Sequence, residues 1–327
     1  MPNAPINIKR YLYPQIEPYA AEHIDVGDGH SIYVEQSGNQ HGIPVLFIHG
    51  GPGGGCNPLQ RRFFDPELYR IILFDQRGCG HSRPHASIDH NTTWHLISDM
   101  ETIRKKFKID QWILFGGSWG STLALLYAQK HTAHVHSIIL RGIFLMMERE
   151  LRWFYQEGTS AIFPEAYENF IELLPEDQRE DVITAYYKLL TGADTAKQLV
   201  AAKRWSIWEG SSVTLIPEDT QTQQLQSASF ALAFARLEAH YFYNKGFLEC
   251  DDQILKDCTL LQNIPMSIVQ GRYDAICPPR SAWALKKQCP HADLNIIKVA
   301  GHSAFEPDII HALVTATDKH AKLYNEG

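Results

Sequence analysis

The chain has 327 residues, of which 44% are hydrophobic and 20% are charged, a balance typical of a soluble globular protein with a sizeable core. Its formal net charge of −7 at pH 7 argues against nucleic acid or an anionic membrane surface as a partner. No apolar stretch reaches the roughly 18 residues of a transmembrane helix, and the first residues lack the basic and apolar segments of a secretory signal, so we expect neither.

Strand-like and helix-like segments alternate along much of the chain. Residues 21–36 alternate around a Gly-Asp-Gly turn, which predicts a β-hairpin. Short apolar runs with the β-branched content of buried parallel strands follow at residues 45–48, 71–74, 112–115, 138–140, 266–269 and 294–299. Helix-compatible segments separate several of these runs, for example residues 94–107 and 281–288. The alternation predicts a doubly wound, mostly parallel sheet with the hairpin at one edge.

This alternation stops between about residue 145 and residue 258, where aromatic-rich amphipathic stretches replace the strand-like runs. We interpret this part as a helical cap over the carboxyl ends of the strands, where open α/β sheets bind ligands. The predicted organisation is an α/β core in two parts, residues 1–144 and 259–327, with the cap at residues 145–258 between them.

Residues 116–120 read Gly-Gly-Ser-Trp-Gly and lie between a strand-like run and a helix-prone run. A G-x-S-x-G segment in this context is typical of a nucleophile elbow, which would expose Ser118 at the end of the strand. The glycines are needed because the strand and the helix pass close together, and a Cβ there would collide. The segment predicts a serine hydrolase; a chance glycine-serine turn is the less favoured interpretation.

A serine hydroxyl needs a base to become a good nucleophile, and the base needs an orienting acid. In enzymes with this elbow the chain order is Ser, then Asp or Glu, then His. Asp274 and His302 each follow one of the last two strand-like runs, so both would occupy loops at strand ends. His49 and His81 are rival histidines in poorer contexts. We therefore predict Ser118, Asp274 and His302 as the catalytic triad.

Backbone N–H groups must stabilise the oxyanion of such a reaction. Trp119, directly after the nucleophile, is expected to supply one, and Gly51 in the glycine-rich segment 49–55 the other. A phosphate-binding loop would need a Lys-Ser/Thr ending, which this segment lacks. Asp75 and Arg77, at another strand end, are interpreted as structural groups that shape the wall of the site.

Several segments together resemble the proline iminopeptidase (prolyl aminopeptidase) family of serine exopeptidases, which have the α/β-hydrolase fold. They are residues 49–54, 75–78, 116–121, 140–142, 271–274 and 301–303. The resemblance runs from about residue 8 to residue 325. It implies an enzyme that releases N-terminal proline from small peptides through an acyl-enzyme intermediate, with no metal and no cofactor.

The resemblance implies that two glutamates of the cap, Glu209 and Glu238, anchor the free amino terminus of the substrate. The sequence supports Glu238 independently, because it lies four residues after Phe234 and three before Tyr241 within one apolar helical stripe. A glutamate at the edge of such a stripe that reaches solvent is the ordinary alternative. Glu209 follows Trp208, but the apolar stripe around Glu209 is weaker. The sequence alone therefore leaves the role of Glu209 undecided.

The resemblance also implies that Phe144 lines the ring of the substrate proline, and Arg141 and Tyr155 are included in the predicted binding set. The family usually carries tyrosines in this cap segment, so Phe154 is a departure that would change a polar contact. Cys277 follows Asp274 by three residues, which would place a thiol near the pocket. Sensitivity to thiol reagents would then arise from blocking of the site.

The six cysteines are scattered, with no C-x-x-C pair and no zinc-ligand spacing, so we expect ordinary thiols in a reducing cytoplasm. Two alternatives to a peptidase remain. A carboxylesterase or C–C-bond hydrolase of the same fold would need no amine anchor, so Glu209 and Glu238 discriminate. A catalytically silent hydrolase-like binding protein is opposed by the intact triad. Ser118 at the elbow, where an aspartate would be needed, disfavours an epoxide hydrolase or dehalogenase.

Overall fold

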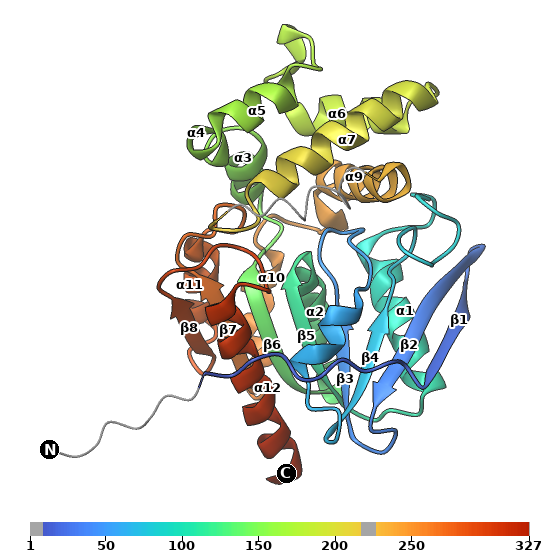
Figure 1. Ribbon diagram of the computed structural model, residues 1–327, viewed down its shortest axis with the longest axis vertical. Coiled ribbons are helices and arrows are strands. Elements are labelled where there is room, and N and C mark those ends of the chain that lie inside the picture. The colour runs from blue at the N-terminus through green and yellow to red at the C-terminus, as the bar shows by residue number, and fades with distance from the viewer. Residues whose placement is uncertain (1–8, 217–226, 327) are drawn as a thin grey trace, which may run out of the picture.

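The computed structural model describes residues 9–216 and 227–326 (Figure 1). The first residues, on which the expectation of no secretory signal rests, lie outside these ranges. The strands are β1 (Ala20–Gly27), β2 (His30–Gly38), β3 (Ile43–Ile48), β4 (Tyr69–Phe74), β5 (Trp112–Ser118), β6 (Val135–Ile143), β7 (Met266–Gly271) and β8 (Asp293–Ile297).

All eight strands form one sheet in the order β1-β2-β4-β3-β5-β6-β7-β8. The hairpin β1–β2 is antiparallel and joins β4 in an antiparallel pair, whereas every pair from β4 to β8 is parallel. The predicted mostly parallel sheet with a hairpin at its edge is therefore confirmed. The last strand ends at Ile297, two residues before the predicted end, where the Ile297 carbonyl accepts the backbone N–H of Arg272.

Helices cover both faces of the sheet, because the central strands are apolar on both sides. On β5, Leu114 belongs to one buried cluster, whereas Ile113 and Phe115 belong to another on the opposite face. Helices α1 (Thr93–Lys106), α2 (Trp119–Lys130) and α11 (Pro279–Gln288) contribute to the first cluster. Helix α12 (Pro307–Glu326) and the 3₁₀ helix η1 (Pro58–Phe63) contribute to the second.

Helices replace strands between residues 145 and 258, as predicted, in the part of that range that the structure describes. They are α3 (Glu148–Tyr155), α4 (Thr159–Ile162), α5 (Pro164–Ile171), α6 (Val182–Thr191), α7 (Thr195–Ser211), α9 (Ala228–Tyr243) and α10 (Gln253–Lys256). The remaining short 3₁₀ helices are η2 (Thr132–His134), η3 (Glu176–Gln178), η4 (Lys245–Phe247) and η5 (Asp257–Leu261).

Helix α9 packs against α6 and α7, and Figure 1 shows α3 to α7 and α9 gathered at one end of the sheet. This arrangement supports the proposed cap. Helix α10 behaves differently, because it packs against α2 and α11 of the core although it precedes residue 258. Within residues 9–216 and 227–326, none of the helices combines the length and the apolar character that crossing a bilayer requires.

Candidate active site

Ser118 is the last residue of β5, and helix α2 begins at the next residue. Its backbone has φ +57° and ψ −127°, in the positive-φ region that non-glycine residues rarely adopt. A Cβ on Gly116 would lie 2.2 Å from the Gly120 carbonyl oxygen, and one on Gly120 would lie 2.1 Å from that of Ile48. The glycines therefore allow the close strand–helix turn that presents the Ser118 side chain.

Asp274, in the loop after β7, is buried and has both carboxylate oxygens engaged. Oδ1 accepts the backbone N–H groups of Ile276 at 3.1 Å and Cys277 at 2.8 Å. Oδ2 accepts from Gln270 Nε2 at 3.1 Å and lies 2.8 Å from His302 Nδ1. Because a carboxylate only accepts hydrogen bonds, His302 must carry its proton on Nδ1. The acid therefore fixes both the orientation and the tautomer of the imidazole.

The other ring nitrogen of His302 faces a guanidinium. Arg141 Nη1 lies 3.0 Å from His302 Nε2 and also donates to the His302 carbonyl at 2.8 Å. Burial lowers the pKa of Arg141. Ser118 and His302 both belong to the described part of the chain, and no hydrogen bond joins them in this structure. Catalytic hydrogen bonds often form only in the complex with the substrate, so His302 stays the predicted base.

The glycine-rich loop after β3 lies directly beside Ser118. A Cβ on Gly50 would be only 3.3 Å from Ser118 Cβ, and Gly51 adopts φ +109°. Gln76 ties this loop to the elbow: its side-chain amide donates to the His49 carbonyl at 2.9 Å, and its Oε1 accepts from Trp119 Nε1 at 3.0 Å. The sequence analysis did not assign a role to Gln76, although its position at a strand end was a signal.

The two rival histidines do not line the pocket that contains Ser118. His49 is buried, and its Nε2 accepts the backbone N–H of Gln76 at 3.1 Å. His81 is exposed and lies beside Asp75, 3.3 Å from its Oδ2. Asp75 also accepts the backbone N–H of Cys56 at 2.6 Å, and it does not line the Ser118 pocket, so its role as a group that shapes the wall stays a prediction.

One pocket brings most of the predicted site residues together. Its walls are Gly51, Ser118, Phe144, Glu150, Leu151, Phe154, Tyr155, Glu209, Glu238, Phe242, Ile276 and Cys277. Arg141 is absent from these walls; it lines a separate hollow together with Gly50, Gly117 and His302. Trp119 is fully buried at the start of α2, where the first backbone N–H groups of a helix have no acceptor within the helix, and its indole already donates to Gln76.

Glu209 on α7 and Glu238 on α9 are both buried, with exposed fractions of 8% and 2%. Tyr155 donates its hydroxyl hydrogen to Glu209, and Trp205 Nε1 donates to Glu238 Oε2 at 2.6 Å. Burial raises the pKa of both glutamates, and the nearby Glu209 raises that of Glu238 further. Among the residues that the structure describes, no Lys or Arg lines this pocket. The two carboxyl groups therefore form a site that a cation would complete.

Four residues of the pocket were missed by the sequence analysis: Glu150, Leu151, Phe242 and Ile276. Phe242 was detectable, since it lies one helical turn after Glu238 on α9. Glu150 carries no comparable signal. Its carboxylate accepts backbone N–H groups of the turn after Phe144 and the hydroxyl of Ser281, so it is already satisfied by the protein.

The cap also holds the loop that carries Asp274. Trp153 Nε1 on α3 and the Thr159 hydroxyl on α4 both donate to the Ala275 carbonyl, at 2.8 and 2.6 Å. Cys277 follows in the same loop, and burial raises the pKa of its thiol well above the usual range. The thiol is therefore protonated near neutral pH and is a poor nucleophile.

Three potential metal ligands come together at two places in the described residues: Asp28, His90 and His95, and His49, Asp75 and Cys79. Neither group includes a member of the predicted triad or one of the paired glutamates.

Comparison with known proteins identifies the fold and the family of the chain. Residues 43–308 match the family model of the alpha/beta hydrolase fold. The chain is 52% identical to a probable proline iminopeptidase of Leptolyngbya boryana, over 95% of this chain and 97% of that protein. It is also 52% identical to a proline iminopeptidase of Xanthomonas citri, over 95% and 100%. A crystal structure of a putative aryl esterase from Burkholderia cenocepacia superposes with a TM-score of 0.64 at 18% identity, over 94% and 100% of the chains, which shows the shared fold.

Proposed function

The chain belongs to the proline iminopeptidase family of the α/β-hydrolase fold, and we propose that it releases N-terminal proline from small peptides. The observation that carries this proposal is the pair of buried carboxyl groups, Glu209 and Glu238, in the pocket that contains Ser118. An exopeptidase must distinguish a terminal amine from an internal peptide nitrogen, and charge is the largest difference between them. Paired carboxylates bind that amine by charge-assisted hydrogen bonds.

The apolar part of the pocket supports the choice of proline. Phe144 and Phe242 pack edge to face at a centroid distance of 5.9 Å, and Tyr155 lies 5.6 Å from Phe242. These rings offer a small apolar wall for a pyrrolidine ring, while the glutamates receive its nitrogen. Fixing the amine in this way sets the distance from the prolyl carbonyl to Ser118.

In the proposed mechanism, His302 Nε2 accepts the hydroxyl proton of Ser118, and Oγ attacks the prolyl carbonyl carbon. The backbone N–H groups of Gly51 and Trp119 stabilise the resulting oxyanion. His302 then gives its proton to the leaving nitrogen, the peptide C–N bond breaks, and the shortened peptide departs. Water, deprotonated by His302, hydrolyses the prolyl ester and releases proline. Asp274 keeps His302 in the required tautomer throughout.

Naphthylamides of proline, hydroxyproline and alanine, each with a free and an N-acetylated amino terminus, test this function. We expect rapid cleavage of the free prolyl compound and little cleavage of its acetylated form. Equal cleavage of both forms would favour an esterase-like enzyme without an amine anchor. No cleavage, together with no labelling of Ser118 by a fluorophosphonate, would support a silent binding protein.

We also propose a cytoplasmic location. All six cysteines lie within the described residues and are free, as is usual in a reducing compartment. Short peptides, the products of other peptidases, would be the available substrates there.

A further inference from the structure

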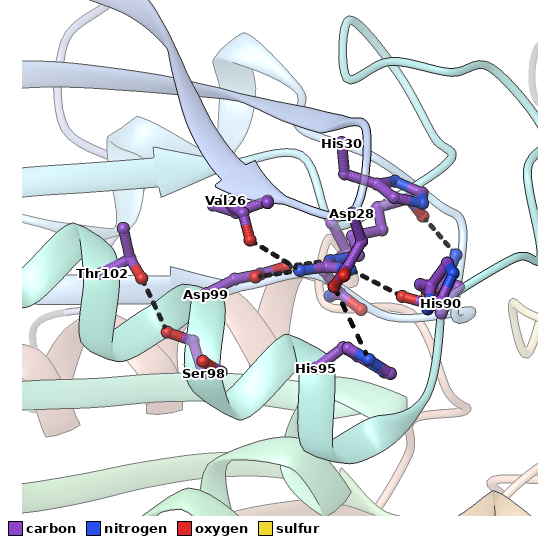
Figure 2. Close-up of polar contacts among 12 residues, drawn as sticks. Val26, Asp28, His30, His90, His95, Ser98, Asp99 and Thr102 are labelled. Carbon is purple, nitrogen blue, oxygen red and sulfur yellow. Dashed lines mark hydrogen bonds and ion pairs between the residues drawn. The ribbon is translucent and has the colours of Figure 1, made fainter.

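A group of metal-binding side chains lies on the hairpin side of the sheet, apart from the Ser118 pocket. Asp28 lies in the turn between β1 and β2, His90 in the loop before α1, and His95 in the first turn of α1. One ligand atom from each residue lies within 4.8 Å of the other two. Figure 2 shows the His95 imidazole beside the carboxylate of Asp28, with His90 close by.

The side chain of His95 is already oriented. Its Nδ1 lies 2.8 Å from the hydroxyl of Thr92, and its Nε2 lies 3.9 Å from Asp28 Oδ2. In the tautomer that donates Nδ1–H to Thr92, Nε2 keeps a lone pair directed at the group. A hydrogen bond from the second ring nitrogen is the usual support of a metal-binding histidine.

The loop that carries His90 is fixed by its neighbours. Arg77 Nη1 donates to the His90 carbonyl at 2.7 Å. Asn91 Nδ2 donates to the carbonyls of Arg77 at 3.0 Å and Ser87 at 2.9 Å. These bonds restrain the backbone on both sides of His90. The loop therefore loses little conformational entropy when a ligand binds.

Arg77 carries a charge that opposes a cation at this place, since its Nη1 lies 3.4 Å from Asp28 Oδ2. However, Asp99 receives two hydrogen bonds from Arg77, at 2.7 and 2.8 Å, and both side chains are only 2% exposed. This bidentate pair neutralises the guanidinium. The charge of Asp28, whose side chain is 42% exposed, therefore remains available to an ion arriving from solvent.

We propose that Asp28, His90 and His95 bind one divalent transition-metal ion of the zinc class. Two imidazoles and a carboxylate are ligands that zinc accepts, with water in the fourth position. Bonds of about 2.0–2.2 Å require the three ligand atoms to move somewhat closer together. Asp28 and His90 are exposed, so rotation of their side chains can bring these atoms closer.

Such an ion would be structural, because it would tie the hairpin turn to the start of α1. The neighbouring Asn91 in turn supports the cap helix α9: its carbonyl lies 2.9 Å from His240 Nε2, and its Oδ1 accepts the Tyr241 hydroxyl at 2.8 Å. The expected result of metal binding is a higher melting temperature, with no part in the hydrolytic chemistry.

The other group of potential ligands, His49, Asp75 and Cys79, does not make a comparable site. It is fully buried, and its groups already bind the protein. His49 Nε2 accepts a backbone N–H from Gln76, and Asp75 accepts those of Cys56 and His81.

Titration calorimetry of the full chain with Zn²⁺ tests the proposal, with His90→Ala and His95→Ala as the site variants. His41→Ala, at an exposed histidine outside the group, is the matched control. Other side chains can also bind Zn²⁺, so the result that matters is the difference in Zn²⁺ stoichiometry between the wild type and each variant. We expect the wild type and His41→Ala to bind one more equivalent than either site variant, and to gain melting temperature with Zn²⁺ where the site variants do not.

Asp28→Asn provides a further check, because it preserves the shape of the turn and removes only the charge. It should lower the affinity of this site for Zn²⁺ at least about tenfold, because one charge-assisted interaction is lost. Folding of every variant is verified by its melting curve without metal. If all the proteins bind Zn²⁺ with the same stoichiometry and affinity, the proposal is wrong.

Discussion

Arg141 Nη1 lies 3.0 Å from His302 Nε2, the nitrogen that accepts the Ser118 proton in the proposed mechanism. A guanidinium only donates hydrogen bonds, so this contact leaves Nε2 unprotonated and ready to act as a base. The same contact must be exchanged for one with Ser118 before the reaction begins. Arg141, which the sequence analysis included in the binding set, thus contacts the proposed base while standing outside the pocket walls.

The triad assignment predicts the effects of two substitutions. Ser118→Ala removes the nucleophile and should lose nearly all turnover while the melting temperature stays close to wild type. Asp274→Asn removes the group that fixes the His302 tautomer and should lower kcat about 10⁴-fold, as the equivalent change does in a serine-protease triad. Steady-state kinetics on prolyl-naphthylamide measures both. Wild-type activity of Asp274→Asn would rule out this residue as the acid.

The amine anchor predicts a substrate-dependent loss. Glu209→Gln and Glu238→Gln keep size but each removes a charge, so each should lose roughly 1.5–3 kcal/mol of interaction with the substrate amine. That corresponds to a fall in kcat/KM of about 10- to 150-fold on prolyl-naphthylamide. Hydrolysis of p-nitrophenyl acetate, which has no amine, is the control and should barely change. Equal losses on both substrates would mean that these glutamates support the fold instead.

The raised pKa values of Glu209 and Glu238 predict a pH dependence. Protonated carboxyl groups cannot pair with the substrate amine, so kcat/KM for the prolyl substrate should fall as the pH drops through about 8, the raised pKa of Glu209. The Gln variants should show a flatter acid limb. A pH profile of each variant, with the ester as the amine-free comparison, measures this. Identical limbs in the wild type and both variants would contradict the assignment.

The same shifts affect stability. A carboxyl pKa raised on folding means that the folded protein binds more protons than the unfolded chain above the ordinary glutamate range. Stability should therefore fall as the pH rises from about 5 toward the raised values. Urea unfolding across this range should show a smaller fall for Glu238→Gln than for the wild type. If the stability of Glu238→Gln falls with pH as much as that of the wild type, Glu238 does not cause the pH dependence.

Cys277 is predicted to be close to the substrate but not to react. A bulky maleimide on its thiol should inhibit by filling the pocket, slowly because burial keeps the thiol protonated. Cys277→Ser should remain active and become resistant to the reagent. Mass spectrometry of the treated protein identifies the modified cysteine. Loss of turnover in a folded Cys277→Ser protein would assign this thiol a direct role.

Two neighbouring glycines of the elbow should differ in their tolerance of a methyl group. A Cβ on Gly116 would meet the backbone of Gly120 at 2.2 Å, so Gly116→Ala should lower the free energy of unfolding by about 1–3 kcal/mol or more. The three atoms nearest to a Cβ on Gly117 would all belong to the Arg141 guanidinium, the closest at 2.6 Å, and this end of a long side chain can move. Gly117→Ala should therefore unfold near the wild-type urea concentration. Equal destabilisation would show that Arg141 is held rigidly.

The sequence by itself determined the sheet and the elbow, and it predicted the members of the triad and their order. These features depend on local signals: apolar runs of strand length, glycines at a turn that must be tight, and polar residues directly after strands. Because parallel strands bring their carboxyl ends to one edge, Asp274 and His302 were expected to meet, and their 2.8 Å contact agrees with that expectation. Glu238 on α9 was also predictable from the sequence, as a charged residue within an apolar helical stripe.

Only the tertiary structure decided which groups face one another across the cap. Glu209 and Glu238 lie on different helices, and their partners Tyr155 and Trp205 depend on how those helices pack. The contact of Arg141 with His302 is likewise invisible in the sequence. Such contacts join residues far apart in the chain, and a helix can turn any of its faces toward a neighbour. Periodicity identifies the buried face of an element, but packing alone selects what that face meets.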